Sequence, residues 1–118
     1  TSAIRYFEGT KEYLDPNFKL NRLALALAIP KHHLSQVLSL GLQRSFYDLL
    51  NQYRIKEVVQ RLNDPSFDHQ TIIEIAYGVG FNSKSTFNTA FKRYMGTTPS
   101  SYREGLSRKA ESQAYPSM

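Results

Sequence analysis

Two stretches of the chain place hydrogen-bonding and cationic side chains at helical spacing with no carboxylate among them. The outward positions of a helix predicted at 83–94 hold lysine, serine, asparagine, threonine and arginine, and those of a helix at 31–40 hold lysine, histidine, serine and glutamine. Asparagine and glutamine can form a two-point hydrogen bond with adenine, while serine and threonine bond to several bases. We therefore predict that six side chains read base edges: His32, Ser35, Gln36, Ser85, Asn88 and Thr89.

A second set of side chains suits the phosphate backbone of DNA. Lysine and arginine supply positive charge, while hydroxyl groups and the helix N-termini predicted after Gln43 and Thr97 supply hydrogen-bond donors. The residues predicted to contact phosphates are Lys31, Arg44, Ser45, Lys84, Lys92, Arg93, Thr98 and Arg103. For both sets the alternative is an ordinary solvated helix face.

The distribution of charge favours an anionic partner more strongly than the net charge does. The 118 residues include 15 lysines and arginines and 10 acidic residues, which gives a net charge of +5. The windows 16–47 and 75–103 contain no acidic residue and hold eight of the basic ones. Each window coincides with one predicted helix-turn-helix, so double-stranded DNA is the predicted partner.

The composition argues against several other classes of protein. Hydrophobic residues make up 41% of the chain, enough to bury a core. The absence of cysteine rules out disulfides and thiolate metal sites and is compatible with a reducing cytoplasm. No apolar run approaches the ~20 residues of a membrane span, so we expect no membrane contact by this segment. Since the chain begins with Thr1, we expect it to be a fragment that lacks an N-terminal partner domain.

The stretch 71–103 predicts two short helices joined by a tight turn. Thr71 and Glu74 form a capping-box pattern at the start of the first helix, whose inner face carries apolar residues at helical spacing. Gly78 and Gly80 end this helix, and the second helix runs until Gly96. Its inner face holds Phe87, Ala90, Phe91 and Tyr94. This arrangement is a helix-turn-helix, and the alternative is a generic three-helix bundle with a polar surface.

An earlier stretch repeats this pattern. A first helix is predicted over 2–15, followed by helices that begin at Leu20 and at Lys31. The apolar positions from Leu20 to Ile29 correspond to those from Ile72 to Phe81 at a constant offset of 52, which becomes 53 after the turn. The repeat predicts two copies of one supersecondary unit, and their differing exposed residues suit two units that read different base pairs.

Between the two copies, residues 46–63 have continuous helical periodicity without glycine or proline. A helix of this length forms a rod of roughly 27 Å, and successive major grooves on one face of B-DNA lie ~34 Å apart. Such a rod can present one recognition helix to each groove. Arg54 lies in the middle of the rod, and we interpret it as a structural residue that ties the rod to its neighbours rather than as a DNA contact.

Other chemistry is weakly indicated. His32 and His33 are adjacent, so they point to different sides of a helix, and no carboxylate completes a metal site at ligand spacing. Asp68 and His69 precede a helix with no nucleophile nearby in the pattern. Glycine loops for phosphates and the Gly-x-Ser-x-Gly motif are missing. We therefore predict no enzyme activity, metal or cofactor. The competing function is a helical adaptor module whose basic face binds an acidic protein.

Several fixed spacings resemble a known family. They are Glu-Ile-Ala (74–76), Gly-Phe (80–81), Ser-x-Ser-Thr-Phe (83–87), Phe-Lys (91–92), Gly96, Thr-Pro (98–99) and Tyr-Arg (102–103). These motifs resemble the C-terminal signature of AraC/XylS-type bacterial transcription regulators, and the resemblance spans about residues 4 to 104. The combinations at 34–38 and 81–87 look most like members from the Bacteroidetes group, some of which carry a preceding sensory portion that is occasionally membrane-embedded.

The resemblance implies a bacterial, cytoplasmic and nucleoid-associated activator that contacts RNA polymerase. It is weaker in the first unit, because such regulators commonly have a serine at Pro30, an arginine at Gln36, a phenylalanine at Leu38 and a glycine at Gln43. Because Gln36 replaces the arginine, the resemblance suggests weaker discrimination between bases, or a preference for A·T pairs, at that position.

The predicted fold class is all-α, with about seven helices in two homeodomain-like helix-turn-helix subdomains on a long linker helix. We predict one DNA-binding domain over 1–118, with subdomains at about 4–44 and 71–104. The linker helix is predicted at about 46–63, and a flexible tail at 105–118 because that segment is polar and lacks a helical period.

Overall fold

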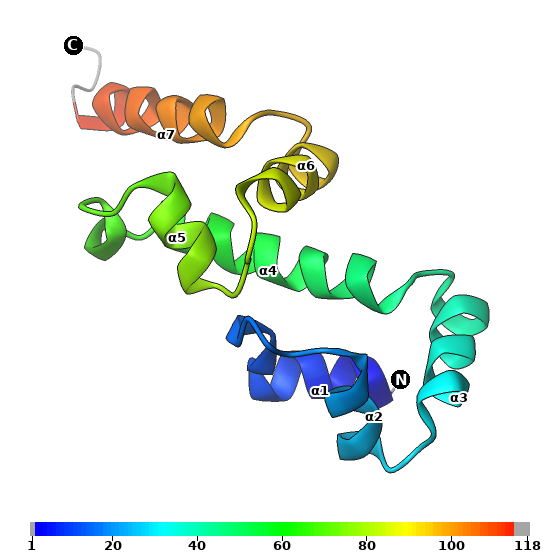
Figure 1. The fold of residues 1–118 in the computed structure, drawn as a ribbon. Helices are drawn as coiled ribbons and strands as arrows, with labels where there is room; N and C mark the ends of the chain where they lie inside the picture. The colour runs from blue at the N-terminus through cyan, green and yellow to red at the C-terminus, as the bar shows by residue number, and fades with distance from the viewer. Residues whose placement is uncertain (1, 115–118) are drawn as a thin grey trace.

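In the computed structural model, residues 2–114 are described, with side chains up to Arg108, and helices are the only regular secondary structure among them (Figure 1). The described residues form seven α-helices: α1 Ser2–Thr10, α2 Leu20–Leu27, α3 Lys31–Val37, α4 Phe46–Leu62, α5 Ile72–Gly78, α6 Lys84–Met95 and α7 Pro99–Ala114. Three short turns of helix join them: η1 Glu12–Leu14, η2 Leu38–Leu42 and η3 Pro65–Phe67. The all-α prediction is confirmed.

The helix α4 is the spine of the molecule and belongs to both of its hydrophobic cores. Its N-terminal half packs into one core with α1, α2 and α3, through Phe46, Leu49, Leu50 and Tyr53. Its C-terminal half packs into a second core with α5 and α6, through Ile55, Val58 and Leu62. In Figure 1, α1 and α2 lie on one side of this rod and α6 and α7 on the other, with α3 beyond its N-terminal end and α5 beside its C-terminal end. The molecule measures 61 × 25 × 24 Å.

The first helix ends earlier than its apolar pattern predicted. We expected a helix over 2–15, but α1 ends at Thr10 and Lys11 takes a left-handed conformation with φ of 55°. The chain then brings Tyr13 into the first core, where its ring lies 5.6 Å from that of Tyr53. The helix has to end before Tyr13 so that its ring can be buried and its carbonyl can make the contacts described below. The apolar spacing of residues 2–15 gives no information about these contacts, because the partners are distant in sequence.

The third helix also differs from its prediction at its C-terminal end. The helix predicted at 31–40 is α-helical to Val37 and continues as one π-helical turn, η2. Leu34 and Leu38 are buried and Leu42 packs against the same core. A spacing of four residues drifts off one face of a 3.6-residue helix, and the wider π-turn returns Leu42 to the core.

The second helix-turn-helix begins and ends as predicted. Thr71 Oγ1 accepts a hydrogen bond from the Glu74 amide (3.2 Å), and Glu74 Oε1 accepts one from the Thr71 amide (2.9 Å), so the capping box is confirmed. The hydrogen bond from the Thr71 amide, and with it the Thr71 hydroxyl, lowers the pKa of the Glu74 carboxyl below its ordinary value. At the other end, Gly96 terminates α6 in a left-handed conformation with φ of 73°.

In place of the flexible tail predicted for 105–118, α7 continues as a helix to Ala114. Arg108 and Glu104 form an ion pair of 2.9 Å at i,i+4, and Leu106 packs against the second core. Helix-forming residues and one apolar anchor therefore extend the helix although the segment has no clear amphipathic period. Residues 115–118 of the predicted tail lie outside the described part of the chain.

Candidate nucleic-acid interface

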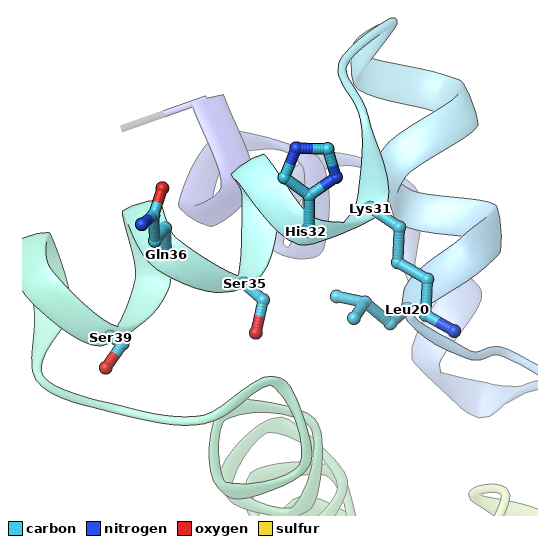
Figure 2. A pocket seen from close by; sticks show the side chains of 6 residues that line it. All are labelled: Leu20, Lys31, His32, Ser35, Gln36 and Ser39. Atoms are coloured by element: carbon cyan, nitrogen blue, oxygen red, sulfur yellow. The ribbon is translucent and has the colours of Figure 1, made fainter.

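The three side chains predicted to read bases from the first unit are exposed on α3. They line a groove together with Leu20, Lys31 and Ser39. Figure 2 shows that His32 and Gln36, one turn apart, point to the same side of the helix, while Ser35 and Ser39 form a neighbouring row. The exposed surface of α3 and the π-helical turn after it therefore presents an imidazole, an amide and two hydroxyls, with a lysine at its N-terminal end.

The predicted base-reading residues of the second unit are exposed on α6 and fall into two rows. Ser85 and Thr89 line a groove between α6 and the first half of α4. Asn88 lines a different groove together with Lys84 and with Ser100 at the start of α7. The outer face of α6 thus has hydroxyls toward α4 and an amide and a lysine toward α7.

A third groove, which we call the central groove, adjoins the groove between α6 and α4. It runs over α4 between the start of α2 and the start of α6, and it is lined by Pro16, Phe18, Lys19, Tyr47, Leu50, Asn51, Arg54, Phe81, Asn82, Ser83 and Thr86. It shares Asn51 and Thr86 with the groove that holds Ser85 and Thr89. Its Lys19 precedes in sequence Leu20, which lines the α3 groove. The central groove therefore adjoins the α6 groove directly and is one residue away in sequence from the α3 groove.

Several of the predicted phosphate-binding cations are accessible. Lys31, Lys84 and Lys92 are exposed. Arg93 also has a mainly exposed side chain, 61% accessible, and it forms an ion pair of 3.1 Å with Asp48. Because Asp48 lines the groove of Ser85 and Thr89, this pair offsets the negative charge that α4 brings to the α6 face.

Two other predicted phosphate ligands, Arg44 and Arg103, are already bound within the protein. Arg44 donates from Nη2 to the Tyr94 hydroxyl (2.9 Å) and from Nη1 to Gln52. Arg103 donates from Nη1 to the Gln70 carbonyl (2.7 Å) and from Nη2 to the Phe67 carbonyl (3.3 Å). These contacts join α4 to α6 and α7 to the η3 loop, so both arginines position recognition elements whether or not they also reach DNA.

The two predicted hydroxyl ligands are helix caps. Ser45 Oγ accepts a hydrogen bond from the Asp48 amide (3.1 Å) at the start of α4. Thr98 Oγ1 accepts one from the Ser101 amide (3.2 Å) at the start of α7. Both side chains remain exposed, and their contact with phosphate stays a prediction.

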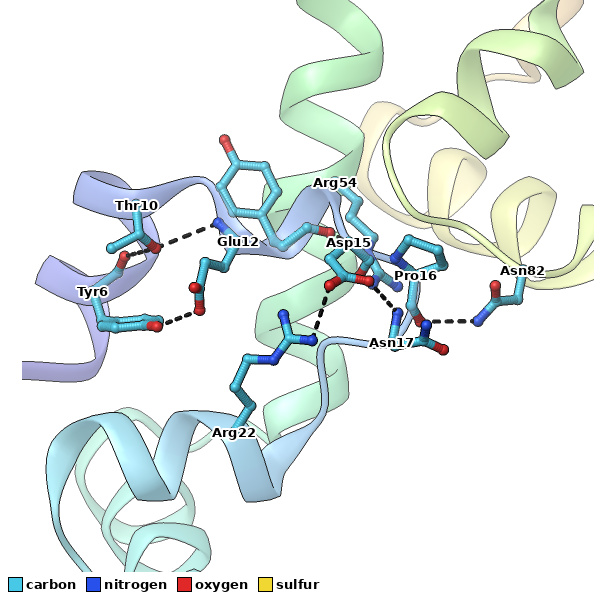
Figure 3. Close-up of polar contacts among 10 residues, drawn as sticks. Tyr6, Thr10, Glu12, Asp15, Pro16, Asn17, Arg22, Arg54 and Asn82 are labelled. Atoms are coloured by element: carbon cyan, nitrogen blue, oxygen red, sulfur yellow. Dashed lines mark hydrogen bonds and ion pairs between the residues drawn. The ribbon is translucent and has the colours of Figure 1, made fainter.

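The structural interpretation of Arg54 is confirmed, because this side chain joins the two units from inside the protein. Arg54 is only 5% exposed, and it donates from Nε to the Tyr13 carbonyl (2.7 Å) and from Nη2 to the Asp15 carbonyl (3.0 Å). Burial lowers its pKa to about 10, which still leaves the guanidinium charged at neutral pH. Figure 3 shows Arg54 beside the loop that carries Asp15 and Pro16.

The turn of the second helix-turn-helix binds the same loop. Asn82 donates from Nδ2 to the Pro16 carbonyl (3.1 Å; Figure 3). Gly80 has φ of 108°, and a Cβ there would lie 2.7 Å from the Tyr13 carbonyl oxygen and 2.8 Å from Arg54 Nε. Only glycine fits such a site. We call these contacts of Arg54, Gly80 and Asn82 with the backbone of 13–16 the inter-unit contact.

Sequence reasoning missed Lys19, Asn51 and Thr86 as groove residues, and it left Tyr47 open between packing and contact with the DNA backbone. Three different elements bring them together. A partial signal was present, because Tyr47, Leu50, Asn51 and Arg54 follow i, i+3, i+4, i+7 spacing and form a stripe along α4.

Among the residues whose side chains the structure describes, no group of three or more His, Asp or Glu side chains could hold a metal ion. The same residues contain no helix that is long and apolar enough to cross a membrane.

Comparisons with known proteins agree with this geometry. A family described as a helix-turn-helix domain matches residues 23–105. The chain is 31% identical over 108 residues to the raffinose operon transcriptional regulatory protein RafR of Pediococcus pentosaceus, a match that covers 88% of this chain and 38% of that protein. It therefore spans little more than a third of that relative's length.

Two solved structures share the fold. One is the C-terminal domain of AraT, a response regulator from Geobacillus stearothermophilus, with a TM-score of 0.72, 31% identity, and coverage of 88% of this chain and 82% of that one. The other is a DNA-binding transcriptional dual regulator from Escherichia coli K-12, with a TM-score of 0.72, 25% identity, and coverage of 86% and 94%.

Proposed function

Because this chain belongs to the helix-turn-helix family of AraC/XylS-type transcription regulators, we propose that it binds double-stranded DNA sequence-specifically, with α3 and α6 in successive major grooves. The observation that supports the proposal is that Ser35 and Gln36 on α3, and Ser85 and Thr89 on α6, are exposed and line surface grooves. A major groove admits one α-helix, and the side chains on its exposed face reach the base edges.

The length of α4 supports the pairing of two grooves. Its 17 residues form a rod of about 26 Å, and each recognition helix is held beyond or beside a different part of that rod. Major grooves on one face of B-DNA recur at ~34 Å, and a rod of this length would suit two recognition helices at a separation of that order. A single chain then contacts two half-sites without a second subunit.

The reading role of α6 is tested by replacing Asn88 with alanine. An amide that forms two hydrogen bonds with an adenine contributes ~1–3 kcal/mol of discrimination, so N88A should bind its preferred site roughly 5- to 150-fold less tightly and accept other bases at one position. The measurement is fluorescence anisotropy on a duplex selected from a random DNA pool by the wild-type chain, together with its single-base variants. Gln60, exposed on α4 away from these grooves, provides the control Q60A, which should behave as wild type. If N88A weakened every variant duplex equally, Asn88 would not read a base.

The phosphate role is tested by replacing Lys92 with alanine. Each phosphate neutralised by a side chain adds ~0.9 to the slope of log affinity against log salt concentration, so K92A should weaken binding to all sequences alike and flatten this slope by about 0.9. Salt titrations on selected and random duplexes give both quantities. K56A removes the same charge from α4, where Lys56 lies over the Tyr53 ring, and it should leave the slope unchanged. A K92A slope equal to that of wild type would contradict the assignment.

The same titrations separate DNA binding from the alternative function of a protein adaptor. An adaptor with a basic face would show no affinity for duplexes at low salt, whereas the proposed function requires binding to random duplexes in the micromolar range or tighter. The family is one of transcription regulators and is not an enzyme class.

The wider role is part of this proposal. Since the chain spans 38% of the raffinose operon regulator, we propose that it is the DNA-binding output part of a longer bacterial regulator that acts in the cytoplasm. In that protein a sensory or dimerisation domain would precede this one, and contact with RNA polymerase would activate transcription. Our reason is that the features described for this chain suit contact with DNA. The detection of a signal would then belong to another domain.

A further inference from the structure

We propose that the central groove is a separate binding site for a phosphate of the DNA backbone, in the segment between the two major grooves that α3 and α6 enter. This inference rests on the proposed function and extends it to residues on α4, on α6 and in the loop before α2, outside both recognition faces. The groove has a volume of about 340 Å³, ample for a phosphodiester group, since one water molecule occupies about 30 Å³.

The lining of the groove suits an anion. It contains one exposed lysine, Lys19, and an exposed tyrosine, Tyr47, which is 58% accessible. Amide and hydroxyl groups from Asn51, Asn82 and Thr86 add hydrogen-bond donors, and no carboxylate is among the lining residues. Lysine, tyrosine, asparagine and threonine are side chains that bind phosphate oxygens in DNA complexes.

The floor of the groove is positively charged as well. Arg54 lines it, and its described hydrogen bonds go to two backbone carbonyls, which leave its charge in place. The nearby carboxylate, Asp15, is bound to Arg22 at 2.8 Å. A buried guanidinium without a carboxylate ligand raises the potential of the space above it.

The position of the groove determines which phosphate it would bind. It shares Asn51 and Thr86 with the groove of Ser85 and Thr89, and its Lys19 is the sequence neighbour of Leu20, which lines the groove of Ser35 and Gln36. In the proposed complex, a duplex that contacts both α3 and α6 would cross the central groove. Between two major grooves on one face of B-DNA, the minor groove and its flanking backbones face the protein, so the group presented there is a phosphodiester.

Lys19 can be replaced without disturbing the fold. It precedes α2 as the N-cap residue, but its side chain makes no capping hydrogen bond. The hydrogen bonds that begin the helix go to the Lys19 backbone carbonyl, from the amides of Arg22 (3.0 Å) and Leu23 (3.3 Å), and alanine keeps this carbonyl. A change in DNA binding in K19A therefore reports on the ammonium group.

The test combines K19A and Y47F with duplexes in which the phosphates between the half-sites are replaced by neutral methylphosphonates. The duplex is one selected from a random pool by the wild-type chain. K19A should lower affinity for all sequences roughly 2- to 12-fold, the range of one net hydrogen bond, and flatten the salt slope by about 0.9. Neutralising the central phosphates should weaken the wild-type chain by a similar factor, and it should have little further effect on K19A, because the two changes remove the same interaction. Y47F should show a smaller loss on the native duplex.

K56A is the matched control, since it removes one lysine charge from α4 but not from the groove, and it should keep the full sensitivity to the central methylphosphonates. The inference is overturned if K19A and Y47F bind like wild type, or if K19A weakens binding but remains fully sensitive to the central methylphosphonates. In either case, the proposed function would still hold if K92A and N88A showed the effects predicted for them above. Failure of the wild-type chain to bind any duplex would remove both.

Discussion

Raising the salt concentration from about 50 to about 200 mM is expected to weaken duplex binding by roughly 500-fold, because about 4.5 counterions are released. This estimate counts five exposed cations around the grooves, each of which neutralises one phosphate: Lys19, Lys31, Lys84, Lys92 and Arg93. The counterions return to the DNA more readily when salt is abundant, so the loss applies to random and selected duplexes alike. Anisotropy titrations at four or five salt concentrations give the slope directly.

The slope also decides the role of the two internally bound arginines. If Arg44 and Arg103 exchanged their protein partners for phosphates, the slope would approach about −6.3, and the same change in salt would weaken binding by roughly 6,000-fold. A slope near −4.5 would show that both arginines keep their protein partners and only position the helices. A slope shallower than about −2 would contradict a phosphate-dominated interface and therefore the basis of the proposed function.

Replacing Arg54 by methionine is expected to lower the free energy of unfolding by about 3 kcal/mol, since a hydrogen bond from a charged donor contributes roughly 1.5–3 kcal/mol and the carbonyls it leaves lose their partner. Methionine keeps most of the apolar stem, which separates the loss of hydrogen bonds from the loss of packing. The two carbonyls, of Tyr13 and Asp15, belong to the first unit, whereas the ring of Phe81 beside the guanidinium belongs to the second. The substitution therefore weakens the connection between the units as well as the fold.

Urea unfolding followed by circular dichroism measures this effect as a lower midpoint at an unchanged slope. The matched control is R108M on α7, where the arginine pairs with Glu104 and the two side chains are 75% and 65% exposed. Exposed pairs contribute little, so R108M should change stability by less than about 0.5 kcal/mol. Equal midpoints for R54M and wild type would show that the inter-unit contact adds nothing to stability.

The elements that were predicted correctly are those whose signals are local. The helix α4 was predicted at 46–63 and found at Phe46–Leu62, because periodicity without glycine or proline fixes a helix by itself. The capping box of Thr71 and Glu74 and the glycine at the end of α6 are also contained within a few residues.

The elements that were predicted incorrectly depend on contacts distant in sequence. The end of α1 at Thr10 serves the burial of Tyr13 against Tyr53, 40 residues later in the chain. The π-turn after Val37 serves the packing of Leu42, and α7 extends beyond Arg103 with the help of Leu106 on the second core. Propensity and periodicity do not encode these partners.

The candidate site divides in the same way. The exposed faces of α3 and α6 followed from helical spacing and from the absence of acidic residues, and the six predicted base-reading residues are all exposed. The partners of Arg44 and Arg103 could not be predicted, because Tyr94 and the carbonyl of Gln70 lie 50 and 33 residues away. An arginine in a sequence gives no indication of whether solvent or a distant carbonyl receives its hydrogen bonds.

The inter-unit contact has a consequence for the genes that such a protein would control. Arg54, Gly80 and Asn82 hold the turn of the second unit on the loop of the first, so the two recognition helices cannot separate to follow a longer binding site. One inserted base pair between half-sites turns the second by about 34° and moves it by about 3.4 Å. A promoter that gains or loses a single base pair there would escape regulation even if every contacted base pair were unchanged. The length of its control region would therefore be constrained as tightly as its sequence.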